Sequence, residues 1–176
     1  MRTSDKKEYM MVLVLLLLIL GAGLIMSSRH SELVFKYPDH PAILNTNDFS
    51  VNTGNGILEI GKSSFADVAK LYPQGRTLGM STVYSPKNSG CLFTFSKKSN
   101  ILITIHINTN QTSTFRHITL NDSFASVVKA YGKNYARVSQ KGDTANFDAV
   151  YGAESSIVFQ IRNNLVKKII IQKEAK

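Results

Sequence analysis

The chain has 176 residues, which suits one domain with a short additional segment, and it carries 21 lysines and arginines against 12 aspartates and glutamates. Cys91 is its single cysteine, which excludes an intramolecular disulfide and with it the small secreted domains that disulfides hold together. The basic residues are scattered along the chain, so the formal net charge of +9 indicates solubility or weak attraction to anionic wall polymers and lipid headgroups.

The N-terminus has a pattern typical of a membrane segment. Residues 1–9 are polar, and residues 10–26 contain no charge. A membrane-spanning helix needs about 17 to 25 apolar residues, whereas the apolar region of a cleavable signal peptide has about 7 to 15. Cations at Arg2, Lys6 and Lys7 predict, by the positive-inside rule, that the N-terminus stays in the cytoplasm. We predict a cytoplasmic tail over 1–9 and a single-pass anchor or uncleaved signal over 10–26, with cleavage as the alternative.

Residues 27–56 have the composition of a linker, because they are rich in serine, asparagine, aspartate and proline. Only Leu33–Tyr37 and Ala42–Leu44 have the apolar content of short strands. We therefore expect a stalk that holds a folded domain a few nanometres outside the membrane.

Two ten-residue stretches, SSFADVAKLY from Ser63 and DSFASVVKAY from Asp122, share one pattern. Ser64 and Ser123 stand where an N-cap belongs, and Pro73 and Gly132 stand where each helix must end. Apolar residues recur at the i, i+3, i+4, i+7 spacing of an amphipathic helix, at Phe65, Val68, Ala69 and Tyr72 and again at Phe124, Val127, Val128 and Tyr131. The pattern predicts one short helix at each place.

Each predicted helix is followed by predicted antiparallel strands. The segments GCLFTFSKKSNILITIHI from Gly90 and SSIVFQIRNNLVKKIII from Ser155 each contain two strands and a short polar turn, and residues 81–84 and 149–151 add one strand each. Aligning Phe95 with Phe159 and Ile105 with Ile169 superimposes the two segments. Alternation assigns to the core Phe93, Phe95, Ile101, Ile103, Ile105, Ile107, Ile157, Phe159, Leu165, Ile169 and Ile171. We predict an α+β fold of two tandem helix-plus-antiparallel-meander repeats, residues 57–114 and 115–176, behind the N-terminal transmembrane helix.

The motif that opens each unit resembles a known fold family. It reads Ile60-Gly-Lys-Ser-Ser-Phe65 with Val68 and Tyr72 in the first unit, and Leu120-Asn-Asp-Ser-Phe124 with Val127 and Tyr131 in the second. Over residues 57–174 the chain resembles the β-lactamase-inhibitor-protein-like tandem fold. It is also similar to SmpA/OmlA-type envelope lipoproteins and to exported YjgB-like domains. The chain has no lipid-acceptor cysteine, no paired cysteines and no tryptophan, so inhibition of a β-lactamase does not carry over from the resemblance.

For the residues that could take part in catalysis or ligand binding, the sequence indicates structural roles. Gly56 to Ser63 fits the phosphate-loop pattern G-x-x-x-x-G-K-S, but its Ile-Leu-Glu-Ile centre favours a strand that leads into a capped helix. The four histidines have no metal-ligand spacing, and alternation places Cys91 toward the core as an inert thiol. We predict no catalytic residue, no metal site, no cofactor and no enzyme activity, and an extracytoplasmic domain leaves no role for nucleotide or nucleic acid.

The strand face opposite the predicted core is unusually apolar for a surface in contact with water. An exposed apolar patch indicates a binding partner, and the alternative is that the stalk or the other unit covers it. The predicted binding residues on this face are Leu92, Thr94, Leu102, Thr104, His106, Val158, Gln160, Val166, Lys168 and Ile170. We predict a membrane-anchored, extracytoplasmic, non-catalytic module that binds a protein or an anionic wall polymer, through this face or through the loops 75–80 and 140–146. The alternative function is an inhibitor or accessory factor of an envelope hydrolase.

Overall fold

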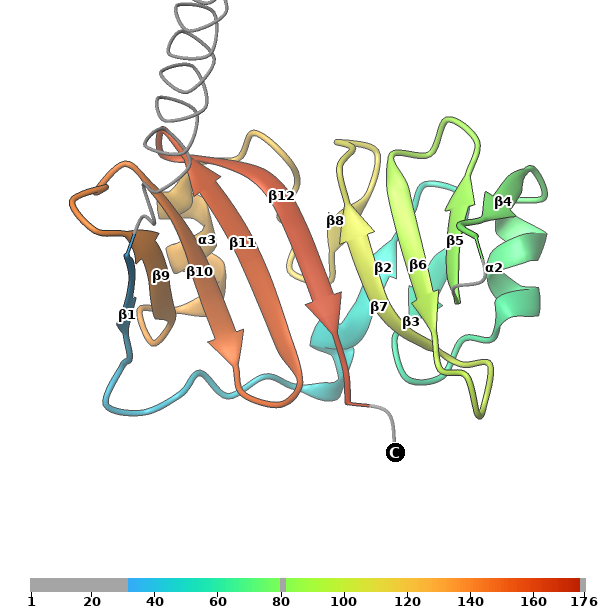
Figure 1. Ribbon diagram of the computed structural model, residues 1–176, viewed down its shortest axis with the longest axis horizontal. Coiled ribbons are helices and arrows are strands. Elements are labelled where there is room, and N and C mark those ends of the chain that lie inside the picture. The colour runs from blue at the N-terminus through green and yellow to red at the C-terminus, as the bar shows by residue number, and fades with distance from the viewer. Residues whose placement is uncertain (1–31, 80–81, 175–176) are drawn as a thin grey trace, which may run out of the picture. The chain divides into compact units, whose positions relative to one another are not determined.

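A computed structural model describes residues 32–79 and 82–174 (Figure 1). The predicted cytoplasmic tail, the uncharged run 10–26 and the first residues of the predicted stalk lie outside the described residues. Among the helices that the model describes, none combines the length and the apolar character that crossing a bilayer requires.

The two predicted helices are present at the predicted places, as α2 (Phe65–Leu71) and α3 (Phe124–Tyr131). Ser64 caps α2 in a capping box with Asp67, and Ser123 caps α3 by accepting a hydrogen bond from the Ser126 backbone N–H. Each apolar stripe has two buried members: Val68 of α2 with its C-cap residue Tyr72, and Val127 and Tyr131 of α3. Helix spacing in the sequence therefore predicted both elements and their buried side.

Nine strands form one antiparallel sheet, seen face-on in Figure 1. In spatial order they are β1 (Leu33–Lys36), β9 (Ala136–Gln140), β10 (Asn146–Gly152), β11 (Ser156–Arg162), β12 (Leu165–Gln172), β7 (Leu102–Ile107), β6 (Cys91–Phe95), β5 (Val83–Pro86) and β4 (Gly75–Thr77). A second sheet contains β3 (Ile57–Glu59), β2 (Ser50–Asn52) and β8 (Ser113–Thr114), and η1 (Thr46–Phe49) precedes β2. The fold is thus α+β with antiparallel sheets.

The two halves of the chain have the same order of elements around the nine-stranded sheet. Helix α2 precedes β4 to β7, and helix α3 precedes β9 to β12. The last strands of the halves, β7 and β12, pair with each other, with Ile105 opposite Ile171 and Ile107 opposite Ile169. Because Ile105 and Ile169 are equivalent within their halves, this pairing relates the halves by a local two-fold axis between His106 and Ile170.

The register corrects the predicted alignment of Phe95 with Phe159. Phe93 lies opposite Ile105, and Phe159 lies opposite Ile169, so Phe93 is the equivalent of Phe159. The reason is the turn that joins the paired strands. Six residues separate the paired Phe95 and Leu102, whereas four separate the paired Ile161 and Val166. The longer turn shifts the offset between the halves from 66 before the turn to 64 after it.

Leu102 and Val166 are in the core, so their assignment to the opposite face was wrong. Both side chains are 0% exposed. Each strand pair has a β-bulge near this point, because Phe95 pairs with Leu102 while Thr94 pairs with Thr104, and the β11–β12 pair has the same irregularity. A bulge adds one residue to one strand and reverses the alternation beyond it. For the same reason Ile101, Ile103 and Leu165, which were predicted in the core, are only half-buried.

Residues 33–56 are part of the folded unit, which corrects their prediction as a stalk. β1 pairs with β9 as the outermost strand of the nine-stranded sheet, and β2 is the central strand of the three-stranded sheet. Phe49 and Val51 are buried in the core. The carboxylate of Asp48 is 1% exposed and accepts two hydrogen bonds of 2.6 Å from the Arg116 guanidinium. Composition suggested a linker because it does not report backbone pairing, which is what holds β1 and β2 in their sheets.

Candidate binding face

The two faces of the nine-stranded sheet differ in what lies against them. One face carries the buried core residues, and the rings of Phe124 and Tyr131 from α3 contact those of Phe147 and Phe159 at 5.0 and 5.2 Å. Accordingly, α3 lies behind β10 and β11 in Figure 1. Among the described helices, none lies against the opposite face, which is turned toward the viewer; we call it the open face.

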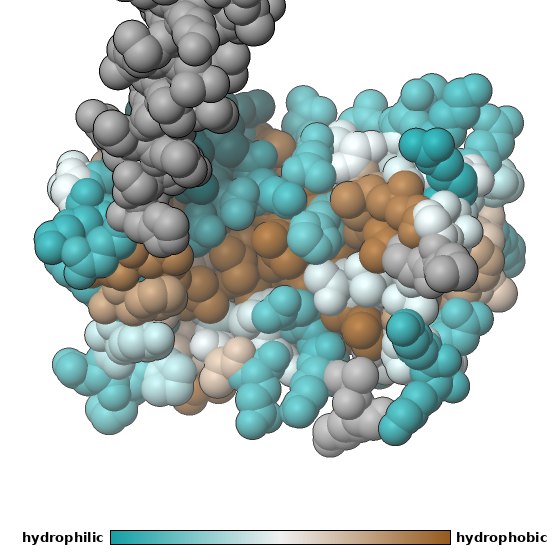
Figure 2. All heavy atoms as spheres, in the orientation of Figure 1, coloured by the Kyte–Doolittle hydropathy of each residue, from teal (hydrophilic) through white to brown (hydrophobic). Residues whose placement is uncertain are grey.

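A row of side chains runs straight across the open face from β9 to β6. Strand pairing places the members directly opposite one another in the order Ala136, Val150, Val158, Ile170, His106 and Leu92. We call this set the cross-strand row; it is apolar except for His106. At a strand spacing of about 4.8 Å, five spacings make the row about 24 Å long. Figure 2 shows a band of hydrophobic atoms across the middle of this face.

Eight of the ten predicted binding residues lie on the open face. They are Leu92, Thr94, Thr104, His106, Val158, Gln160, Lys168 and Ile170, and all are half-buried, which is typical of side chains on a sheet that no other layer covers. The sequence interpretation missed Ala136 and Val150. Alternation with the core residues Ala149 and Tyr151 could have indicated Val150. In β9 the alternation is inverted, because Arg137 lies on the core side over the Phe147 ring and the apolar Ala136 lies on the open face.

Polar side chains flank the cross-strand row on both sides. In one half, Thr94 lies opposite Thr104. At the equivalent positions in the other half, Gln160 lies opposite Lys168, and Asp148 continues that line on β10. Lys168 has no ion pair with any carboxylate in the described part of the chain. The open face therefore combines an apolar centre with hydrogen-bonding groups at its edges.

His106 is the polar exception within the row. Its Nδ1 atom is buried and lacks a hydrogen-bond partner among the residues that the model describes. Burial lowers the pKa of His106 below its ordinary value of 6.5, and the neighbouring positive charge of Lys168 lowers that pKa further. The imidazole is therefore neutral at pH 7.

An apolar hollow lies at the β9 end of the cross-strand row. It has a volume of about 320 Å³, and among its walls are Tyr37, Pro41, Ala136 and Val150. Two of these residues belong to the row itself, so the hollow deepens the row rather than forming a separate site. An aliphatic or aromatic side chain has the chemistry to fill it.

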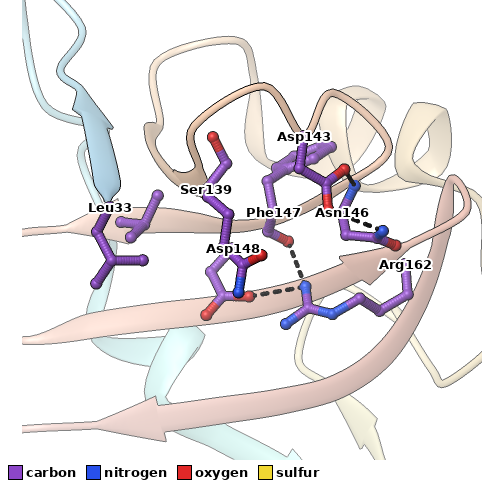
Figure 3. A pocket seen from close by; sticks show the side chains of 9 residues that line it. Leu33, Ser139, Asp143, Asn146, Phe147, Asp148 and Arg162 are labelled. Carbon is purple, nitrogen blue, oxygen red and sulfur yellow. Dashed lines mark hydrogen bonds and ion pairs between the residues drawn. The ribbon is translucent and has the colours of Figure 1, made fainter. Parts of the chain in front are cut away.

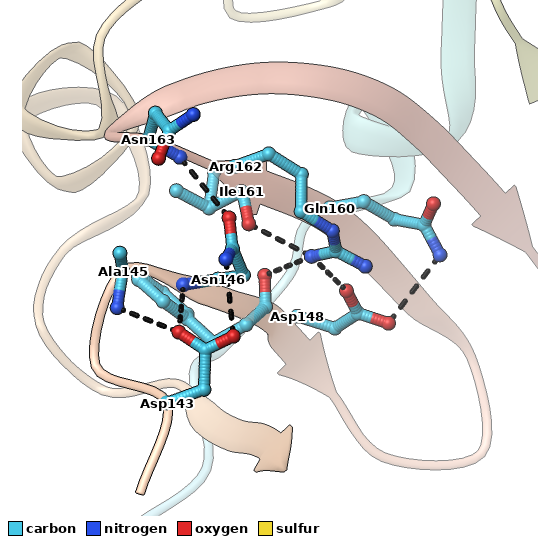
Figure 4. Close-up of polar contacts among 9 residues, drawn as sticks. Asp143, Ala145, Asn146, Asp148, Gln160, Ile161, Arg162 and Asn163 are labelled. Carbon is cyan, nitrogen blue, oxygen red and sulfur yellow. Dashed lines mark hydrogen bonds and ion pairs between the residues drawn. The ribbon is translucent and has the colours of Figure 1, made fainter. Parts of the chain in front are cut away.

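A second hollow of about 400 Å³ lies near the turn between β9 and β10 and is more polar (Figure 3). Arg162 donates to the Asp148 carboxylate at 3.1 Å and to the Phe147 carbonyl oxygen at 3.0 Å, and Gln160 also donates to Asp148 (Figure 4). Asp143 accepts hydrogen bonds from the backbone N–H and side-chain amide of Asn146 and from the backbone N–H of Ala145, and these bonds lower the Asp143 pKa. The carboxylates of Asp143 and Asp148 thus already accept hydrogen bonds from neighbouring residues, and they contribute to the structure of the rim of the open face.

The residues set aside in the sequence have structural roles. Ile57–Glu59 is strand β3, so the phosphate-loop pattern contains a strand that leads to the capped helix α2, as predicted. Cys91 is 2% exposed, and burial raises the pKa of its thiol. No group of three or more His, Cys, Asp or Glu positioned to hold a metal ion occurs within residues 32–79 and 82–174.

In comparisons with protein-family models, curated proteins and solved structures, nothing matches this chain. The resemblance to the β-lactamase-inhibitor-protein-like fold therefore stays a prediction from the motif residues.

Proposed function

We propose that the protein is a non-catalytic binding module, anchored in a membrane by residues 10–26 and exposed outside the cytoplasm, that recognises a protein partner through the open face. The observation that carries the proposal is the cross-strand row, an apolar surface about 24 Å long against which none of the described helices lies. Contiguous exposed apolar surface is typical of protein interaction sites.

The chemistry of the face favours a protein over an anionic wall polymer. A polyanion needs clustered cations, but the cross-strand row is apolar apart from His106, and Arg162 already pairs with Asp148. Protein interfaces combine an apolar centre with a polar rim, which is the arrangement of this face. We expect the partner to cover the cross-strand row from Val158 to Leu92 and to place a hydrogen-bond acceptor near Lys168.

A binding role also accounts for the polar groups of the face. Nucleophilic catalysis requires a nucleophile within hydrogen-bond reach of a base, and His106 Nδ1 has no such partner among the described residues. The Asp148 carboxylate is held by Arg162 and Gln160. These side chains can recognise a ligand as they stand, without proton transfer.

We further infer that the two halves are copies of one helix-plus-meander module. The common order of elements, the matching bulges and the equivalent capped helices support this inference. Pairing of β7 with β12 joins the copies into one sheet and doubles the surface of the open face.

Substitution on the open face tests the proposed function. Ile170→Glu and Leu92→Glu in the full-length chain should leave the thermal unfolding temperature close to that of the parent, because both side chains point away from the core. They should abolish partner capture from detergent-solubilised envelopes, because a charge buried in an interface without a counter-charge is costly.

Ile57→Glu is the matched control. Ile57 is a large exposed hydrophobic residue, 71% exposed, and it lies on β3 of the other sheet. This variant should retain partner capture. Variants of the open face that fold and still capture the same protein would refute the proposal, and capture of a wall polymer instead of a protein would replace it.

A further inference from the structure

Exposed large hydrophobic side chains are concentrated near the N-terminal end of the described chain. The described residues include seven such side chains, and four of them fall within residues 33–43. These four are Leu33 at 56%, Phe35 at 53%, Tyr37 at 76% and Ile43 at 88% exposed. Single exposed hydrophobic residues are ordinary, but a concentration in one short segment indicates a contact surface.

Three of these side chains point the same way. Leu33, Phe35 and Tyr37 alternate along β1 and the residue after it, and the rings of Phe35 and Tyr37 stack with centroids 6.4 Å apart. Among the described strands β1 pairs only with β9, and Phe35 lies opposite Val138, so these side chains form the outer edge of the open face. We call Leu33, Phe35 and Tyr37 the β1 surface.

The chain that precedes β1 limits where this surface can be. The uncharged run ends at Met26, seven residues before Leu33. A fully extended chain advances at most about 3.6 Å per residue, so β1 lies within about 25 Å of the end of that run. If the run spans a bilayer, as the proposed function requires, this distance keeps the β1 surface close to the lipid headgroups.

We infer that the β1 surface docks on the lipid bilayer into which the chain is anchored. The side-chain types fit that environment, because tyrosine and other amphipathic or apolar residues are favoured at the boundary between headgroups and acyl chains. The net charge of +9 also favours an anionic surface. The inference rests on the proposed membrane anchor but not on a partner at the open face.

Docking would fix the orientation of the open face. Four strand spacings separate β1 from β12, about 19 Å at about 4.8 Å each. The centre of the cross-strand row would then be held near the membrane surface instead of swinging freely on a linker.

The test places an environment-sensitive fluorophore on the β1 surface of the full-length chain in vesicles of phosphatidylcholine and phosphatidylglycerol. A nitrobenzoxadiazole label on Tyr37→Cys should show emission shifted to the blue and should lose intensity when the vesicles contain lipids with a quenching group near the headgroup. The control is the same label on Ile57→Cys. These positions are 76% and 71% exposed, so neither label disturbs the core. Unsubstituted chain, with its buried Cys91, reports background labelling.

Flotation of the same vesicles after an alkaline wash separates the two hypotheses. A chain that floats, with the label at position 37 as exposed to water as the label at position 57, refutes docking and leaves the anchor intact. A chain that does not float refutes the anchor and the docking with it. A blue shift at position 37 that grows with protein density and ignores the quencher lipids assigns the β1 surface to a second copy of the chain, which also refutes docking.

Discussion

At equivalent core positions, both halves of the nine-stranded sheet carry buried apolar side chains. Phe93 and Phe159 are both 0% exposed, and each pairs across the strands with an isoleucine. Each ring also contacts the tyrosine that ends its own stripe of helix residues, Tyr72 at 5.5 Å and Tyr131 at 5.2 Å. On the open face the same strand positions differ, with His106 in place of Ile170 and Thr104 in place of Lys168.

Core positions and open-face positions of the sheet are therefore constrained in different ways. A core side chain must fill a closed space, so equivalent positions in two packed copies accept the same kinds of residue. An open-face side chain does not have to fill a closed space, so a binding partner can determine which residue stands there. The differences at His106 and Thr104 therefore mark open-face positions whose chemistry the core does not dictate.

The largest expected effect comes from the equivalent core phenylalanines. Phe93→Ala and Phe159→Ala should each lower the free energy of unfolding by about 3–5 kcal/mol, because each removes a fully buried ring and leaves a cavity. Chemical denaturation of the two variants measures both values. If one variant costs much less than the other, the two sites are not equivalent and the structural alignment of the halves is wrong.

The Asp48–Arg116 ion pair breaks the symmetry of the halves, because it ties η1 to the segment before α3. Arg116→Ala should cost about 3 kcal/mol, since it leaves the Asp48 carboxylate buried without its partner. Lys62→Ala removes the exposed pair with Glu59 and should cost less than about 1 kcal/mol. Equal losses in denaturation experiments would show that residues 45–49 are not held in the fold as described.

The sequence predicted those parts of the fold that a local residue pattern determines by itself. The serine caps and the apolar stripes located α2 and α3, and alternation located the hairpins. Alternation failed at Leu102 and Val166 because a bulge depends on the pairing of two strands, which a single strand does not encode. The same limit applies to the candidate site: alternation placed eight residues on the open face, but Ala136 joins the row only through pairing with Val150.

The helix caps offer a finer comparison of the halves. Ser64→Ala should cost about 1 kcal/mol, and Ser123→Ala should cost less, because only Ser64 belongs to a reciprocal capping box. Hydrogen bonds from Ser64 lower the Asp67 pKa below 3.8, so their contribution is present above that pH and is lost as the pH falls through the lowered pKa. Denaturation at pH 7 and in strong acid should show the difference between the two variants shrinking in acid.

The smallest effect concerns His106, which replaces the isoleucine of the other half. Lys168→Gln should raise the His106 pKa only part of the way toward 6.5, because burial is the larger cause of its lowering. A lowered histidine pKa means that the unfolded chain binds the proton more readily, so stability falls as the pH drops below 6.5. Titration of the imidazole by NMR measures the pKa in both proteins. An unchanged value would place Lys168 too far from His106 for the described face.

Site-specific photo-crosslinking from the centre of the cross-strand row tests the central claim most directly. A photoreactive amino acid at Val158 in the full-length chain, expressed in its native cells, should give a discrete adduct with one other protein, and the added substitution Ile170→Glu should remove that adduct. The same group at Ile57 should give no such product. Crosslinks from position 158 to other parts of the same chain would show that the face is covered internally and would contradict the account.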